Sequence, residues 1–299
     1  TQKLIEWICN YNRNNIDPVS FHGIDQWEDP WVSRDLIKSG VDYLNDKKTL
    51  ELYLKAKKSC YAWQINSWSD GPSMISWNYL LENWILPRES HHLCIGSLFN
   101  LQRSISNLDD GSKVMFWMKL ALKVTYVYEI YRDRFIVDIT RALNLRDELQ
   151  AFLVKAWMDK YNNNKRAILL AHNIHISKRQ SVVIPSNPGD QFRWVGVRST
   201  GENLQAHYGA RYKAIAISGH EVFSSRDGAY NVNTANDSLD NYLARKGDLF
   251  IVNPQVRWIK KKKWWMQNEN TPLYLNPSIQ YDAILFTRTS KPAIRIEFD

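Results

Sequence analysis

Residues 166–175 read Arg-Ala-Ile-Leu-Leu-Ala-His-Asn-Ile-His, an apolar run that ends in two histidines. The run follows a helical pattern over 145–161 and three turn-forming asparagines, and its length is typical of a strand buried on both faces. Ligands of an open parallel sheet bind just past the carboxyl ends of its strands, which is where His172 and His175 stand. The stretch therefore predicts a fold and the place of its chemistry.

Apolar periodicity divides the chain into a helix-rich first half and a second half in which helices alternate with short strands. In the first half we expect a short strand at 19–24 and helices at 4–11, 30–43, 49–57, 74–85, 93–105 and 114–131. In the second half we expect helices at 145–161 and 201–207 and strands at 166–171, 212–217, 249–252 and 283–286. This alternation indicates an α/β fold with a mostly parallel sheet covered by helices and a helix-rich insertion in the first half.

No Gly/Ser-rich linker forces a boundary, so one domain over 1–299 is predicted. Its helical subregion should cover about 29–161, and its α/β part about 1–28 and 162–299. The longest apolar stretch, 114–131, is interrupted by three charged residues, which favours a core helix over a membrane span. We expect no membrane partner.

The formal charge of +8 raises the question of a polyanionic partner. Most basic residues are interleaved with acids, and the one dense run, Lys260 to Lys263, lies between tryptophans. Such a run favours a solvated loop or strand edge, and the alternative is a groove for single-stranded nucleic acid. Because the rest of the charge is dispersed, no nucleic-acid partner is expected.

The three cysteines, Cys9, Cys60 and Cys94, are too few and too widely spaced to predict a disulfide framework. None forms a Cys-x-x-Cys pair of the kind that binds zinc or performs redox chemistry. The pattern is typical of a reducing, cytoplasmic setting.

Two imidazoles three residues apart can act as a general base and an electrophilic or orienting partner, since histidine titrates near neutral pH. Asn173, between them, is placed to fix a tautomer or to donate to a developing oxyanion. Neither a third zinc ligand, nor a Gly-x-Ser-x-Gly elbow, nor a phosphate-cradling glycine loop is found. We therefore expect no metal and no cofactor. The adjacent His91 and His92 favour a surface role.

The segment Ala171 to His175 resembles the Ala-His-Asn-x-His motif of the erythromycin esterase family. Other parts of the chain resemble the same family in order and spacing, namely Trp7 to Asn12, Phe21 to Gln26, Leu145 to Glu148, Gly201 to Leu204, Tyr208-Gly209, Tyr212, Phe223, Asp227-Gly228 and Tyr281 to Phe286.

This resemblance implies a hydrolase in which a histidine base activates water against an ester without a covalent acyl intermediate. Its best-known substrates are macrolide lactones, so the implied role is inactivation of an antibiotic. His172 and His175 match the family's functional pair, while Arg146 and Asp25 match positions that face the same cleft. A guanidinium suits a carbonyl or carboxylate oxygen on which negative charge develops, which gives Arg146 a catalytic role. We assign Asp25 and Asn173 to substrate binding.

Simpler roles remain open for two of these residues. Arg146 can pair with its neighbour Asp147 or cap a helix, and Asp25 can cap the turn before Trp27. The family also places a Gly-Glu-x-x-His-Gly motif on its first strand, and this sequence contains none. We therefore expect a domain that is incomplete at its N-terminus, and the alternative function is a binding protein on the same fold that lacks a catalytic base.

Overall fold

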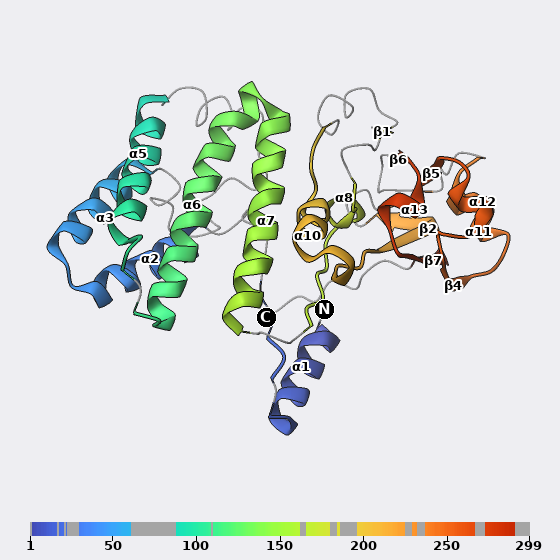
Figure 1. Ribbon diagram of the computed structural model, residues 1–299, viewed down its shortest axis with the longest axis horizontal. Helices are drawn as coiled ribbons and strands as arrows, with labels where there is room; N and C mark the ends of the chain where they lie inside the picture. The colour runs from blue at the N-terminus through green and yellow to red at the C-terminus, as the bar shows by residue number, and fades with distance from the viewer. Residues whose placement is uncertain are drawn as a thin grey trace.

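The computed structural model describes residues 2–16, 18–20, 22, 30–60, 88–108, 110–161, 166–179, 184–185, 196–224, 229–231, 237–266 and 273–290. Helices dominate its first half, and short strands with short helices make up its second half (Figure 1). The long helices are α1 (Gln2–Asn14), α2 (Pro30–Leu44), α3 (Lys47–Ser59), α5 (Arg88–Ile105), α6 (Lys113–Val137) and α7 (Ile139–Tyr161). They confirm every predicted helix of the first half except 74–85, which lies outside the described residues.

Local capping explains where these helices begin. The side chain of Asp46 accepts a hydrogen bond from the backbone N–H of Thr49 at the start of α3, and Ser112 does the same for Met115 at the start of α6. Each cap satisfies one of the N–H groups that the first turn of a helix leaves without an intrahelical partner. Capping and periodicity together position the helical half.

Helix α6 joins two apolar clusters. Met118 and Leu122 belong to the cluster that α6 shares with α2, α3 and α5, whereas Leu120 and Val127 belong to a second cluster with α7. Apolar residues on both sides of one helix predict that it is covered on both sides, and burial at these positions confirms the predicted core helix. No helix within the described ranges is long and apolar enough to cross a bilayer.

A disulfide joins Cys60, at the end of α3, to Cys94 in α5. The spacing of the cysteines predicted no disulfide framework, and this one bond was not expected; it forms because α3 packs against α5 and brings together residues that are 34 apart in sequence. Cys9 is exposed and not bonded to another cysteine. Since disulfides persist mainly in oxidising compartments, the cysteines no longer argue for a reducing setting.

The described part of the second half contains five helices before the last strand, three of them a single turn: α8 (Asn173–Ile176), α10 (Thr200–Tyr208), α11 (Leu239–Ala244), α12 (Arg257–Lys260) and α13 (Pro277–Gln280), with the 3₁₀ turn η4 (Gly209–Arg211). Its strands are β1 (Ile184–Pro185), β2 (Ile215–Ser224), β3 (Ala229–Asn231), β4 (Leu249–Val252), β5 (Trp264–Met266), β6 (Leu273–Leu275) and β7 (Ala283–Thr289). The predicted helix at 201–207 and the predicted strands at 249–252 and 283–286 are confirmed. The strand predicted at 212–217 is present but begins at Ile215.

The described strands form two small sheets, in the orders β1-β6-β5 and β3-β2-β7-β4. Only β2 and β7 pair in parallel, and the other pairs are antiparallel. The prediction of a mostly parallel sheet is therefore wrong. Parallel neighbours need long crossover connections, usually helical, whereas α11, α12 and α13 have only six, four and four residues.

The segment 166–171 also differs from its prediction as a strand buried on both faces. It is extended but pairs with no described strand, and Ile168 and Leu170 are exposed while Leu169 and Ala171 pack on the core of the second half. The predicted strand at 19–24 is not found at 19, 20 or 22, and its other residues lie outside the described ranges. An apolar run alone does not show whether a second layer covers it.

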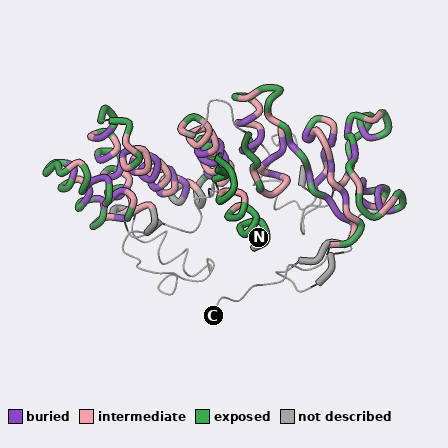
Figure 2. The backbone as a smooth tube through the Cα atoms, turned by 90° about the horizontal axis from the view of Figure 1, so that it is seen from below, coloured by how far each residue is buried: buried purple, intermediate pink, exposed green. Residues whose placement is uncertain are grey.

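One face of the four-stranded sheet is open to solvent. The register places Ile217 of β2 beside Leu285 of β7, and Leu285 beside Ile251 of β4, which makes a row of aliphatic side chains across the sheet. Ile217 and Ile251 are 61% and 71% exposed. The opposite face is buried against α11. Figure 2 shows buried positions in both halves of the molecule, and α1 mostly exposed between them.

Candidate active site

His172 and His175 occupy one helical turn at the end of the extended segment. His172 is the N-cap of α8 and His175 is its third residue, and the backbone N–H of His175 donates to the carbonyl of His172 over 2.9 Å. The turn therefore fixes the backbone of both histidines at α8, which lies beside α10 between α7 and the sheets (Figure 1).

Hydrogen bonds give the two rings opposite tautomers. Nδ1 of His175 lies 2.7 Å from Oδ1 of Asp147, which is fully buried, so this nitrogen donates and the lone pair of the neutral ring is on Nε2. Nδ1 of His172 accepts from the backbone N–H of Ile174 over 3.5 Å, so its proton is on Nε2. One ring is thus prepared to accept a proton at Nε2 and the other to donate one.

Asn173 is bound to the backbone of β2. Its Nδ2 donates to the carbonyl of Ile217 over 2.6 Å, and its Oδ1 accepts from the N–H of Ile217 over 3.0 Å. The side-chain amide thus bonds both the C=O and the N–H of Ile217, as the backbone of a neighbouring strand would. It favours a positioning role for Asn173, which anchors the histidine turn to the edge of the sheet.

Buried Tyr281 and partly buried Tyr212 hold the same turn. The hydroxyl of Tyr212 donates to the carbonyl of Ile176 over 2.7 Å, and that of Tyr281 lies 3.4 Å from the carbonyl of Asn173. Burial raises the pKa of both tyrosines, with a smaller contribution to Tyr212 from Asp282 and to Tyr281 from Tyr212. Both therefore remain neutral hydrogen-bond donors at neutral pH.

Asp282 links the histidine turn to the sheet. Its carboxylate accepts from Nζ of Lys178 over 2.7 Å and from the backbone N–H of Ala214 over 2.8 Å. Burial acts to raise the pKa of Asp282, but these two hydrogen bonds and the charges of Lys178 and Lys213 outweigh it, so the pKa lies below its usual value. The carboxylate is charged at neutral pH and ties the end of the turn to β2 and β7.

The other predicted residues are less closely joined to this site. Arg146 is on α7, half-buried, immediately before Asp147. Asp25 lies outside the described residues, and nearby His22 stacks on Trp157 of α7 with ring centroids 4.0 Å apart. His91, predicted to have a surface role, is instead partly buried and lies 3.2 Å from the buried carboxylate of Glu129 in the helical half. His92 is exposed.

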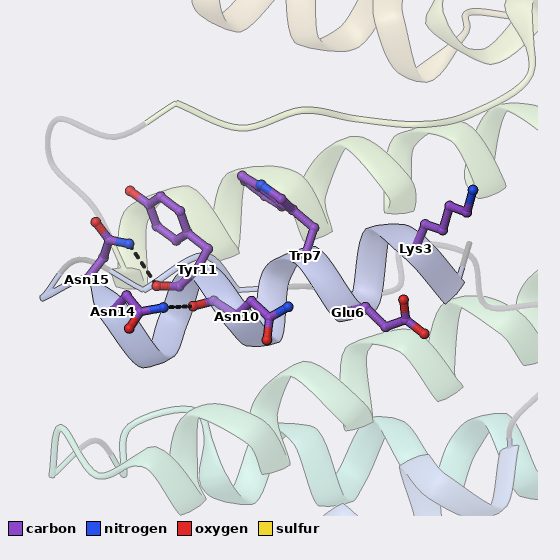
Figure 3. Close-up of a pocket in the computed structure, with 7 residues that line it drawn as sticks. All are labelled: Lys3, Glu6, Trp7, Asn10, Tyr11, Asn14 and Asn15. Carbon is purple, nitrogen blue, oxygen red and sulfur yellow. Dashed lines mark hydrogen bonds between the residues drawn. The ribbon is translucent and has the colours of Figure 1, made fainter.

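A cavity of about 430 Å³ lies along α1 and not at the histidines. Figure 3 shows its lining residues on one side of that helix. The rings of Trp7 and Tyr11 are neighbours there, with their centroids 5.3 Å apart. Asn14 and Asn15 donate to backbone carbonyls one turn earlier, so these two amides are held within the helix end. The cavity contains no imidazole, and its lining does not include a residue predicted for catalysis.

The described part of the chain contains no group of three His, Cys, Asp or Glu side chains placed to hold a metal ion. In the basic run, the ammonium of Lys262 lies 3.7 Å from the centre of the Trp264 ring and that of Lys263 lies 5.7 Å from the centre of the Tyr274 ring. Lysines in such positions cover aromatic rings while their charged ends stay in water. This is the arrangement expected for a solvated edge.

The histidine turn and the helix order can now be compared with known proteins. A family model described as erythromycin esterase matches residues 1–290. The chain belongs to the erythromycin esterase family. Membership places it among the hydrolases of that family and agrees with the resemblance noted in the sequence.

Structural comparison gives the erythromycin esterase-like chain a solved neighbour. A crystal structure of a Bacillus cereus protein aligns with a TM-score of 0.71 and 16% sequence identity, over 96% of this chain and 71% of the other. At this identity the likeness concerns the fold alone, which is helix-rich with small mixed sheets. No curated protein matches the chain.

Three residues of the site were not predicted, namely Asp147, Gln150 and Thr200. Asp147 and Gln150 lie on the buried side of α7, and the hydroxyl of Thr200 at the start of α10 lies 2.7 Å from Asp147 Oδ1 and 2.6 Å from Gln150 Oε1. The sequence contained an indication of this site, because the helical period places Asp147 and Gln150 on the same side of the helix as the apolar residues Leu143 and Ala151. Polar side chains on the apolar side of a helix indicate a buried polar site.

Proposed function

We propose that the protein hydrolyses an ester by activating water between His172 and His175, with His175 as the general base. The observation that carries this proposal is the pair of contacts at Nδ1 of the two rings, from His175 to Asp147 and from the N–H of Ile174 to His172, which together favour opposite tautomers. Nε2 of His175 takes a proton from the attacking water, and Nε2–H of His172 donates to the carbonyl oxygen as negative charge develops on it. The tetrahedral intermediate then collapses, the C–O bond of the ester breaks, and His175 returns its proton to the leaving alkoxide, so no covalent acyl intermediate is formed.

A macrolide lactone is the substrate class that we propose, which makes inactivation of an antibiotic the biological role. Family membership supports the ester chemistry, and the exposed aliphatic residues beside the turn support an apolar substrate. Ile217 is hydrogen-bonded to Asn173, and Leu170 lies two residues before His172; both side chains are more than 60% exposed. Arg146, on the helix that carries Asp147, is proposed to bind the carbonyl or carboxylate oxygen.

The test is hydrolysis of erythromycin and of a simple aryl ester in ¹⁸O-labelled water, followed by mass spectrometry. We expect one ¹⁸O atom in the carboxylate product. His175→Ala and His172→Ala should each lower kcat by about 10²–10⁴-fold, the range for a lost general acid or base. His207→Ala is the matched control, because this histidine is exposed at the end of α10 and its ring makes an edge-on contact with that of its neighbour Tyr208.

Two results would contradict the proposal. Activity within about twofold of the wild type in both histidine variants would remove the pair from the chemistry. Stabilisation of the fold by the macrolide without any product would identify the alternative function, a binding protein on the same fold, because a ligand that binds only the native state raises its stability without turnover.

A further inference from the structure

We infer that Asp147 is the positioning residue of His175, and that Thr200 holds its carboxylate in place. This inference rests on the proposed function, since it concerns the same base. Asp147 does not touch the substrate in this scheme. It acts by fixing the orientation and the tautomer of the ring that does.

Three donors converge on one oxygen of Asp147. Oδ1 accepts from Nδ1 of His175 over 2.7 Å and from the backbone N–H of Thr200 over 2.8 Å, and it shares the single proton of the Thr200 hydroxyl, 2.7 Å away, with Gln150 Oε1, which is 2.6 Å from that hydroxyl. A carboxylate oxygen offers about two lone pairs, so this oxygen is saturated and its carboxylate cannot turn without losing several bonds. The ring of His175 is therefore held by a group that is itself fixed.

The three partners come from three different elements that are locked together. Asp147 is on α7, His175 on α8, and Thr200 is the first residue of α10. Gly201 lies so close to the carbonyl of Ile176 that a Cβ there would be 2.3 Å from its oxygen, and the hydroxyl of Ser199 donates to the carbonyl of Ser177. The start of α10 is thus docked on the histidine turn on both sides of Thr200, which gives the precision that a base requires.

The charge of Asp147 also has a role that hydrogen bonding alone does not supply. When His175 takes a proton from water the ring becomes a cation, and a buried carboxylate 2.7 Å away stabilises that cation strongly because little solvent screens the pair. The other carboxylate oxygen, Oδ2, is buried and has no hydrogen-bond partner among the described residues. The donors to the carboxylate among the described residues are therefore all at Oδ1.

Two substitutions separate these roles. Asp147→Ala removes both the hydrogen bond and the charge, so the tautomer of His175 should no longer be fixed. Asp147→Asn keeps an oxygen at Oδ1 for all three donors and places its N–H₂ at the position of Oδ2, so the tautomer should be kept while the charge is lost. Asn should therefore restore part of the activity that Ala loses.

The first readout is the ¹⁵N spectrum of the histidine rings at about pH 9, where imidazoles are ordinarily neutral. The signals of His175 are assigned by their loss in His175→Gln. We expect a protonated Nδ1 and an unprotonated Nε2 in the wild type and in Asp147→Asn, and a shift toward protonated Nε2 in Asp147→Ala. An unchanged tautomer in Asp147→Ala would overturn the inference, because the carboxylate would then not be what fixes the ring.

The second readout is steady-state hydrolysis. A positioning residue that does not touch the substrate should lower kcat and leave KM unchanged. We expect a loss on the order of 10³–10⁴-fold for Ala, by analogy with other carboxylate–histidine pairs, and a smaller loss for Asn. Equal kcat in Ala and wild type would contradict the inference.

One further variant keeps the inference testable. If Asp147→Ala does not fold, Thr200→Val takes its place, since it removes one donor to Oδ1 while keeping the shape of the side chain. It should lower kcat about tenfold at constant KM, the order expected for a small misplacement of a catalytic group. Unchanged kcat in Thr200→Val would then overturn the inference. A wild-type protein with the expected tautomer but without ester hydrolysis would refute the proposed function and leave the positioning by Asp147 intact.

Discussion

Gly201 marks the closest approach between α10 and the histidine turn, and replacing it with alanine should damage both stability and the site. A Cβ at this position would lie 2.3 Å from the carbonyl oxygen of Ile176, where ordinary contact begins at 3.4 Å. The obstructing atoms belong to the backbone of Ile176 and Ser177, which cannot rotate away as a side chain can. One element must therefore retreat by 3.4 − 2.3 = 1.1 Å.

A retreat of that size would also move Thr200, the residue before Gly201, away from Asp147. The hydrogen bond from the N–H of Thr200 to Asp147 would lengthen from 2.8 Å to 2.8 + 1.1 = 3.9 Å, which breaks it. Overpacking costs about 1–3 kcal/mol, a lost hydrogen bond to a charged group about 1.5–3 kcal/mol, and alanine returns about 1 kcal/mol of helix propensity. The free energy of unfolding should therefore fall by about 1.5–5 kcal/mol.

Urea unfolding followed by far-ultraviolet circular dichroism measures this change, and Gly96→Ala is its matched control. Gly96 lies inside α5 and a Cβ there would meet nothing within 4 Å. Alanine at that position should raise stability by about 1 kcal/mol, because only the propensity term remains. An unfolding midpoint of Gly201→Ala at or above that of the wild type, with an unchanged slope, would refute the close-approach argument.

Two further predictions concern other parts of the molecule. Reduction of the disulfide between Cys60 and Cys94 should lower the stability of the helical half by about 3–4 kcal/mol, because this bond closes a loop across a sequence separation of 34 and so restricts the unfolded chain. The double variant Cys60→Ser/Cys94→Ser should show the same loss in urea unfolding without reductant, and added reductant should not change its stability. A change of its stability on adding reductant would show that the loss has another origin. The lowered pKa of Asp282 predicts that its carboxylate stabilises the folded state in a pH-dependent way. This stabilisation is fully present above the usual pKa range of aspartate, and it is lost as the pH falls through that range toward the pKa of the folded state. Asp282→Asn should therefore be less stable than the wild type at pH 7 and should lose less stability on acidification toward about pH 3, and parallel pH curves for the two proteins would show that this carboxylate is not responsible.

The helices were largely predictable from the sequence because their signals are local. A 3.6-residue apolar period and caps such as Ser112 determine where α6 and its neighbours begin. The sheet was less predictable, because pairing depends on partners that are remote in the chain. Ile168 to Leu170 have the composition of a buried strand, yet burial of both faces requires layers that no local pattern reports.

The candidate site shows the same division. The motif containing His172 and His175 was visible as a short pattern, but the residue that holds His175 was not predicted. Arg146 has the more obvious charge for an oxyanion, whereas Asp147 has the helical phase that directs it to the buried side of α7 and so to His175. Cys60 and Cys94 were missed for a related reason, since spacing along the chain does not measure distance in space.

The uncovered row formed by Ile217, Leu285 and Ile251 has a practical consequence for any measurement of turnover. Water-exposed branched aliphatic side chains on a flat sheet favour self-association, and an apolar fluorescent dye or light scattering would report it. Asn173 attaches the histidine turn beside Ile217, so aggregates built through this face would bury the proposed catalytic histidines. Specific activity should then decline as the protein is concentrated, and rates for different variants are comparable only at matched dilution.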